Sequence, residues 1–253
     1  MRSQTTIVIA ALAVFASATA IASGQEDLAD RIDGLASRYH ELEQFNGSLL
    51  VATGGELVLA KGYGMADFEW EIPNRPDTKF RLGSITKQFT AALVMQLVDE
   101  GRLSLDDPLS KLLPWYRKDT GDRVTLRQLL NHTSGIPSYT SGRFFREQSR
   151  DARPLKELVS ELCSGDLEFE PGSTFRYNNS GYVILGAVLE EATGTTYEQL
   201  LAERILQPLG MDDTTFNPPE SVRGRIAPTE ACSPGDTSCG ASAAMLRGIV
   251  HDP

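Results

Sequence analysis

The sequence of 253 residues is poor in histidine and has no clustered positive charge. Its three histidines, His40, His132 and His251, show no metal-ligand spacing, so the sequence gives no indication of a metal site. Lysine and arginine total 24 against 34 acidic residues, which leaves a formal net charge of −10. A nucleic-acid partner and attachment to an anionic membrane surface are therefore not expected.

Cysteine is equally scarce, with only Cys163, Cys232 and Cys239 in the chain. Cys232 and Cys239 flank a Ser-Pro-Gly-Asp-Thr-Ser loop and could close a small disulfide, although two unpaired thiols fit this spacing as well. Cys163 follows an apolar stretch and is interpreted as a small residue of the hydrophobic core.

The N-terminus carries the sequence features of an exported protein. Met1-Arg2 supplies a positive start, Ile7 to Ile21 is apolar and alanine-rich, and Ala18-Thr19-Ala20 is an A-x-A cleavage site. These features predict a signal peptide over residues 1–24 and a periplasmic or secreted protein with no stable membrane insertion after cleavage. The alternative, an uncleaved anchor, requires a longer apolar run than this one. No cysteine follows the run, so lipid attachment is not indicated.

The first part of the remaining chain predicts strands. Apolar spacings of three and four from Asp27 to Phe45 predict an amphipathic helix. The apolar runs Gly47 to Thr53 and Glu56 to Tyr63 are separated by Gly54-Gly55, which indicates a hairpin. Met65 to Ile72 is predicted to be a third strand. Because a hairpin needs further strands or a packed face to be stable, partners for this sheet are expected later in the chain.

The middle of the chain predicts helices. The segment from Ser84 to Glu100 is apolar nearly all round, which predicts a buried helix, and Gly101 is placed to end it. Further helices are expected over Asp106 to Leu113, Thr125 to Asn131 with Thr125 as N-cap, Pro154 to Cys163, Ser180 to Ala192 and Thr196 to Leu206, the last two separated by Gly194. Irregular chain is expected over Ser138 to Arg153 and Asn217 to Gly240, and a new ordered element over Ala241 to Val250.

The segment Ser84-Ile85-Thr86-Lys87 carries the clearest indication of chemistry. A serine and a lysine at i and i+3 share one helix face and can touch. The apolar surroundings of Lys87 disfavour its charge, so that it can serve as a base, and the helix N-terminus can stabilise an oxyanion near Ser84. This pattern points to a serine acyl-transfer enzyme without a catalytic histidine. The alternative is that Ser84 caps the helix and Lys87 is solvated.

A second element, Tyr177-Asn178-Asn179, precedes an apolar helix. A phenol beside an ammonium group gives up its proton more readily, so Tyr177 could exchange protons with Ser84 or with a leaving group. Asn179 could hydrogen-bond Lys87 and donate to a substrate amide. The alternative is a simple turn with an asparagine cap.

His132, in Leu129-Leu130-Asn131-His132-Thr133-Ser134-Gly135, raises a rival mechanism based on a Ser–His pair. The chain contains no strict G-x-S-x-G elbow. We therefore interpret His132 as a buried, hydrogen-bonded structural residue.

These motifs resemble those of the serine β-lactamase-related hydrolases, which comprise class C β-lactamases, D-alanyl-D-alanine carboxypeptidases and related esterases. The similarity covers roughly residues 45–253 and its motifs follow the family order. The matching stretches are Gly62 to Asp67, Phe80 to Ala91, Gly101 to Pro108, Leu129 to Pro137, Phe175 to Tyr182 and Ile205 to Met211.

The resemblance implies an α+β fold of the β-lactamase/transpeptidase type, with an antiparallel sheet, flanking helices and a helical domain. It implies that Ser84 is the nucleophile, that Lys87 and Tyr177 share the proton transfers, and that Asn179 binds the substrate. Members of the family need no cofactor. The expected substrate is a small molecule or peptide with an ester, amide or lactam bond, as for an esterase, a cell-wall peptidase or a β-lactamase.

The chain departs from the family pattern in two places. Asn178 stands where serine or alanine is common, and no Lys/His-Thr/Ser-Gly tripeptide follows Tyr177. The family strand that carries this third motif also supplies an oxyanion amide. We therefore expect residues 25–253 to form a hydrolase domain that is incomplete at its C-terminus, without the late strands. A catalytically inactive fragment or ligand-binding relative remains the alternative to a serine hydrolase.

Overall fold

The computed structural model describes residues 27–141 and 154–216. These residues form two compact units that divide between Lys79 and Phe80. The predicted signal peptide over 1–24, the predicted elements after Phe216 and the possible Cys232–Cys239 disulfide lie outside the described residues.

The first unit contains the predicted hairpin. Strands β1 (Gly47–Thr53) and β2 (Glu56–Tyr63) pair antiparallel, with Gly47 opposite Tyr63 and Thr53 opposite Glu56. The register shifts between Val51 and Ala52, where the ladder is irregular. Both strand ranges agree with those predicted from the sequence.

The predicted third strand from Met65 to Ile72 is wrong. The segment instead holds two short antiparallel strands, β3 (Met65–Asp67) and β4 (Ile72–Pro73). Between them the Asp67 carboxylate accepts a hydrogen bond from the backbone N–H of Trp70 at 2.9 Å. This local hydrogen bond stabilises a reversal of the chain, which the alternation of apolar residues did not reveal.

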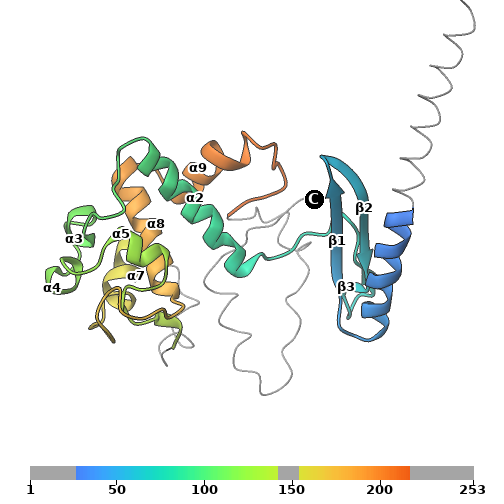
Figure 1. The fold of residues 1–253 in the computed structure, drawn as a ribbon, viewed down its shortest axis with the longest axis horizontal. Coiled ribbons are helices and arrows are strands. Elements are labelled where there is room, and N and C mark those ends of the chain that lie inside the picture. The colour runs from blue at the N-terminus through green and yellow to red at the C-terminus, as the bar shows by residue number, and fades with distance from the viewer. Residues whose placement is uncertain (1–26, 142–153, 217–253) are drawn as a thin grey trace, which may run out of the picture. The chain divides into compact units, whose positions relative to one another are not determined.

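The predicted amphipathic helix covers residues 27–41 and lies beside the β1–β2 hairpin (Figure 1). Asp33 on this helix accepts hydrogen bonds from Lys61 Nζ at 2.7 Å and from the Tyr63 hydroxyl at 2.7 Å. Its apolar positions Leu35 and Tyr39 are nevertheless 60% and 48% exposed. Within the described part of the first unit, polar contacts therefore attach the helix more than apolar burial does.

The second unit is helical, and most of its helices lie where the sequence predicted them, with ends that differ by one to a few residues. They are η1 (Gly83–Ile85), α2 (Thr86–Asp99), α3 (Leu109–Leu112), α4 (Lys118–Gly121), α5 (Leu126–Leu130), η2 (Tyr139–Ser141), α7 (Leu155–Leu162), α8 (Asn179–Thr193), α9 (Tyr197–Leu201) and η3 (Ala202–Leu206).

Helix α8 is the central helix of the core in the second unit, and α2, α5, α7 and α9 all contact it (Figure 1). The side chains of Ile184, Leu185 and Leu189 on α8 are fully buried, as are Leu97 on α2 and Leu129 on α5. Burying one such side chain stabilises the fold by about 1.5–3 kcal/mol. The core thereby fixes the N-terminal ends of α2 and α8, where the predicted site residues lie.

Cys163 joins this core, as predicted, with no exposed surface. Burial raises the pKa of its thiol to about 12. Since the thiolate is the reactive form, Cys163 is an inert packing residue.

Among the described residues, helix α2 is buried on one face and exposed on the other, so the prediction of a buried helix is correct for one face only. Its buried positions, Thr86, Thr90, Leu93, Val94 and Leu97, recur at helical spacing. On the other side Met95 is 44% exposed among the described residues. The reason is that α2 packs against α8 and α9, which cover a single face of it.

The glycines predicted to end two helices and the predicted N-cap Thr125 are confirmed. Gly101 and Gly194 each follow a helix with φ of 70°, the left-handed conformation that favours glycine at this position. Thr125 is the N-cap residue of α5, and its backbone N–H donates to Gln128 Oε1 at 2.9 Å. Such a bond between an N-cap residue and the third helical residue satisfies a donor that the helix leaves free.

The arrangement is an α+β fold, with antiparallel strands in the first unit and helices in the second. In residues 27–141 and 154–216, no helix combines the length and apolar character that a membrane span requires.

Candidate active site

The four residues singled out in the sequence meet in the second unit. Tyr177 donates its hydroxyl proton to Ser84 Oγ at 2.7 Å, and Lys87 Nζ donates to the same oxygen at 3.3 Å. Lys87 Nζ also donates to Asn179 Oδ1 at 2.9 Å. A hydroxyl, an amine, a phenol and an amide thus form one continuous hydrogen-bonded group, although Ser84 and Tyr177 are 93 positions apart.

The start of α2 places Ser84 and Lys87. Ser84 lies in the 3-10 turn η1, and Lys87 lies in the first turn of α2, so that the i, i+3 spacing brings the two side chains together. The N-cap residue of α2 is Ile85, which makes no side-chain cap hydrogen bond. Ser84 therefore does not cap α2, and its exposed hydroxyl contacts Lys87 and Tyr177 instead.

Aromatic rings surround the amine of Lys87, which is partly buried. Its Nζ lies 4.8 Å from the centre of the Tyr177 ring and 5.6 Å from that of Tyr182. An ammonium group at these distances is attracted to the ring faces. Lys87 is therefore held by two phenol rings and the Asn179 amide, in a less apolar place than the sequence suggested.

Backbone hydrogen bonds to a neighbouring loop position the segment that carries Tyr177. The loop that begins at His132 runs alongside residues 168–176, and three backbone hydrogen bonds join the two segments. They are Arg176 N–H to His132 O at 2.9 Å, Gly172 N–H to Thr133 O at 2.8 Å and Glu168 N–H to Gly135 O at 2.8 Å.

Glycine is required at position 135 for this close approach. Gly135 has a φ of 75°, and a Cβ there would lie only 2.3 Å from the carbonyl oxygen of Phe169. A larger residue would push the two segments apart, so packing explains the glycine at position 135.

Asn178 fixes the turn between Tyr177 and α8. It is the N-cap residue of α8, with its Oδ1 accepting from Gly181 N–H at 2.7 Å and its Nδ2 donating to the backbone carbonyl of Ile136. The asparagine-cap alternative is therefore correct for Asn178, and this cap places Tyr177 and Asn179 on either side of it.

Thr140 orients the amide of Asn179. Asn179 Nδ2 donates to Thr140 Oγ1 at 3.0 Å, which leaves its Oδ1 to accept from Lys87. Sequence reasoning missed Thr140, and no local signal could have revealed it, because the contact spans 39 residues.

Tyr182 was also missed, although the sequence held a signal. It lies three residues after Asn179 on α8, and residues at that spacing share a helix face. Its hydroxyl donates to the backbone carbonyl of Leu130 at 3.0 Å, and burial raises the pKa of Tyr182. The Tyr182 ring is thereby held beside Lys87 with its hydroxyl protonated.

The His132 ring packs against both phenol rings at a tilt. Its ring centre lies 4.7 Å from that of Tyr177 and 5.2 Å from that of Tyr182. Its Nδ1 accepts the backbone N–H of Asn178 at 3.1 Å, so the neutral ring carries its proton on Nε2. Burial, followed by the charge of Lys87, lowers the pKa of His132. Neither ring nitrogen retains a free lone pair, which argues against a Ser–His pair.

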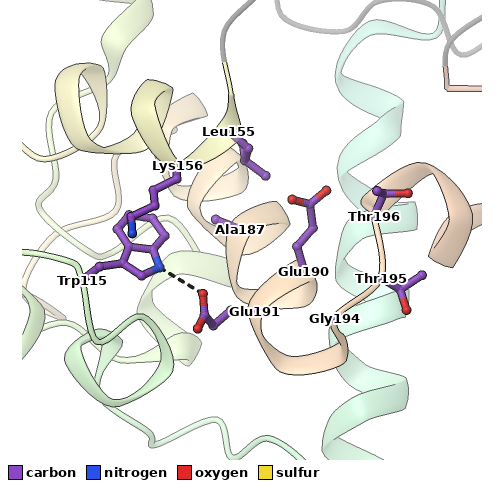
Figure 2. Close-up of a pocket in the computed structure, with 9 residues that line it drawn as sticks. All are labelled: Trp115, Leu155, Lys156, Ala187, Glu190, Glu191, Gly194, Thr195 and Thr196. Carbon is purple, nitrogen blue, oxygen red and sulfur yellow. Dashed lines mark hydrogen bonds between the residues drawn. The ribbon is translucent and has the colours of Figure 1, made fainter.

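A separate hollow of about 310 Å³ lies away from these residues, between Trp115, α7 and the C-terminal end of α8 (Figure 2). Trp115 Nε1 donates to Glu191 at 3.0 Å, and Glu190 accepts the backbone N–H of Tyr197 at 2.9 Å. Lys156 Nζ lies 5.3 Å from the centre of the Trp115 ring. Each of these polar groups thus already has a partner within the protein. Across the described ranges, no three potential metal ligands gather into a site.

Comparison with known proteins identifies the family of this chain. A family model described as Beta-lactamase matches residues 28–247. Teichoic acid D-alanine hydrolase of Staphylococcus aureus is 34% identical over 190 residues, which are 75% of this chain and 46% of that protein. The chain therefore spans about half the length of the curated relatives it matches.

Two solved structures share the fold. The D-amino acid amidase of Ochrobactrum anthropi, complexed with D-phenylalanine, is 27% identical with a TM-score of 0.70, covering 90% of this chain and 68% of that one. EstCE1, a hydrolase with promiscuous acyltransferase activity, is 30% identical with a TM-score of 0.69, covering 81% and 56%. These relatives are hydrolases, and nothing in the comparisons favours the inactive alternative. The fold is of the β-lactamase/transpeptidase type, and the chain belongs to the serine β-lactamase-related family.

Proposed function

We propose that this chain carries the nucleophile and the proton-transfer groups of a serine hydrolase that forms an acyl-enzyme on Ser84. The observation that carries the proposal is the double contact on Ser84 Oγ, which Tyr177 reaches at 2.7 Å and Lys87 at 3.3 Å. A hydroxyl becomes a useful nucleophile when a base lies within hydrogen-bond reach, and here two candidate groups do.

In the proposed acylation, Lys87 Nζ or the Tyr177 oxygen enters the step without the proton that it donates to Ser84 in the structure, and takes the Ser84 proton while Oγ attacks the carbonyl carbon of the substrate. The tetrahedral intermediate then collapses, the bond to the alcohol or amine breaks, and the leaving group takes up the proton. Water hydrolyses the acyl-enzyme in a second step by the same route. Each general acid–base contribution is expected to be worth about 10²–10⁴-fold in rate.

The start of α2 and Asn179 assist in this scheme. The amide dipoles at the N-terminal end of α2 favour negative charge near Ser84, where the oxyanion forms. Asn179 holds Lys87 through Oδ1 and has its amide oriented by Thr140. We propose that Asn179 positions the lysine and contacts the substrate amide.

The substrates we propose are small esters, amides or lactams. The names of two relatives mention D-alanine and D-amino acids, so D-aminoacyl esters and amides are the first compounds to test. The predicted signal peptide would place the enzyme outside the cytoplasm, in the periplasm or the medium. N-terminal sequencing of the exported protein would test that placement, since a start between residues 21 and 25 is expected.

The test of function is intact-mass analysis after exposure to a fluorophosphonate probe. One adduct per chain is expected, and peptide mapping should place it on Ser84. The Ser84→Ala variant should remain unmodified, while Ser173→Ala, which changes an exposed serine in the same unit, should label like the parent. Labelling that persists in Ser84→Ala would refute the assignment. Hydrolysis of nitrophenyl esters of D-alanine, compared with nitrocefin, then separates the substrate classes.

A further inference from the structure

The backbone at His132 is unusual for a residue with a large side chain. His132 directly follows Asn131, the C-cap residue of α5, and has a φ of 61°. The N–H of Thr133 bonds to Gln128 O at 2.9 Å and that of His132 to Leu129 O at 3.4 Å. This is the Schellman arrangement, in which glycine is the usual residue at the left-handed position. Histidine here therefore adopts a conformation that its backbone does not favour.

The side chain gives a reason for keeping histidine at this position. Its ring packs against that of Tyr177 at 4.7 Å, tilted by 38°, and against that of Tyr182 at 5.2 Å, tilted by 35°. Phe175 meets the same ring edge-on at 5.9 Å. The ring thus lies among three aromatic side chains, one of which donates to Ser84.

A hydrogen bond restrains the ring as well. His132 Nδ1 accepts from the backbone N–H of Asn178, the residue between Tyr177 and Asn179. The backbone carbonyl of His132 accepts from Arg176 N–H. His132 therefore contacts the Tyr177 segment at three places. These are the backbone of the preceding residue, the ring of Tyr177 and the backbone of the following residue.

We propose that His132 is a positioning residue that holds the Tyr177 ring so that its hydroxyl meets Ser84 Oγ. The inference rests on the proposed function, because it assigns His132 an effect that passes through Tyr177. Tyr177 is 47% exposed and lies in a loop, so the contact with the His132 ring and the adjacent hydrogen bonds restrict the tyrosine ring. A displacement of about 1 Å at a reacting group can cost about 10²-fold in rate.

Two substitutions separate positioning from general stability. His132→Gly suits the left-handed backbone and removes the ring, and His132→Asn also tolerates this backbone while keeping an oxygen near the place of Nδ1. Both are expected to lower the first-order rate constant for Ser84 acylation by roughly 10- to 100-fold, with the reversible binding constant of the probe unchanged. A cooperative thermal unfolding transition shows that a variant is folded. If only one of the two variants folds, that variant alone is enough for the test.

The deciding measurement is a double-mutant cycle with Tyr177→Phe. If His132 acts through the Tyr177 hydroxyl, His132→Asn in the Tyr177→Phe background should cause little further loss. Full acylation in folded His132→Asn or His132→Gly would overturn the inference, and so would losses that multiply in the double variant. If Tyr177→Phe alone acylates at the parental rate, the proposed role of Tyr177 is wrong. Failure of the proposed function is thereby distinguished from failure of the His132 inference.

Discussion

The two units of this chain are stabilised in different ways. In the described part of the first unit, Ala36 and Tyr63 are the buried apolar residues, and Asp33 links the helix over 27–41 to β2 through Lys61 and Tyr63. The second unit has a continuous core around α8. All four proposed site residues belong to the second unit, where the helix ends that carry them rest on buried side chains. Chemistry that depends on tenths of an ångström is thus built on the better-packed unit.

The largest expected contrast concerns one lysine in each unit. Lys87→Ala should lower the rate of Ser84 acylation by about 10²–10⁴-fold, because it removes a group that contacts Oγ and orients Asn179. Lys61→Ala, which removes the contact to Asp33 in the first unit, should acylate at the parental rate. Fluorophosphonate labelling followed over time measures both. Near-parental labelling in Lys87→Ala would contradict the proposed role of Lys87 in the acylation of Ser84.

A second contrast concerns one leucine in each unit. Leu185→Ala creates a cavity in the core and should reduce the free energy of unfolding by about 2–5 kcal/mol. Leu57→Ala, at a side chain that is 61% exposed, should change it by less than about 0.5 kcal/mol. Urea denaturation monitored by circular dichroism compares the two variants. Equal losses would mean that Leu57 is covered in solution.

Removing the side-chain cap of α8 should reduce the free energy of unfolding by an intermediate amount. Asn178→Ala leaves Gly181 N–H and Ile136 O without their partner, and we expect a loss of about 0.5–2 kcal/mol in unfolding free energy. Asn178→Asp keeps the acceptor for Gly181 and should recover part of that loss. The same denaturation experiment measures both, and an unchanged midpoint for Asn178→Ala would show that the cap contributes nothing.

The smallest expected effect is a pH-dependent one in the first unit. Hydrogen bonds from Lys61, and then from Tyr63, lower the pKa of Asp33. The folded state therefore binds this proton less tightly than the unfolded state, whose aspartate pKa is about 3.9. The contribution of Asp33 to the free energy of unfolding is present above the unfolded-state pKa. It is lost as the pH falls through the lower pKa of the folded state. Asp33→Asn should melt slightly below the parent at pH 7, and this difference should vanish in acid. A difference that grows in acid would contradict the assignment.

The sequence by itself determined the elements that depend on near neighbours. The β1–β2 hairpin, the amphipathic spacing of residues 27–41 and the left-handed glycines at 101 and 194 follow from patterns within a few residues. The spacing of Ser84 and Lys87 likewise follows from one helix turn. The family resemblance added Tyr177 and Asn179, and the structure brings them to the same place.

Only the tertiary structure decided the surroundings of those residues. Thr140 against Asn179, and the His132 ring against Tyr177 and Tyr182, are contacts between distant segments that local propensity does not specify. The exposed face of α2 has the same origin, because an apolar composition predicts burial without saying which side another helix will cover. Helix turns and tight loops are set by bond rotations within a few residues, whereas a side chain's neighbours are set by how the whole core packs.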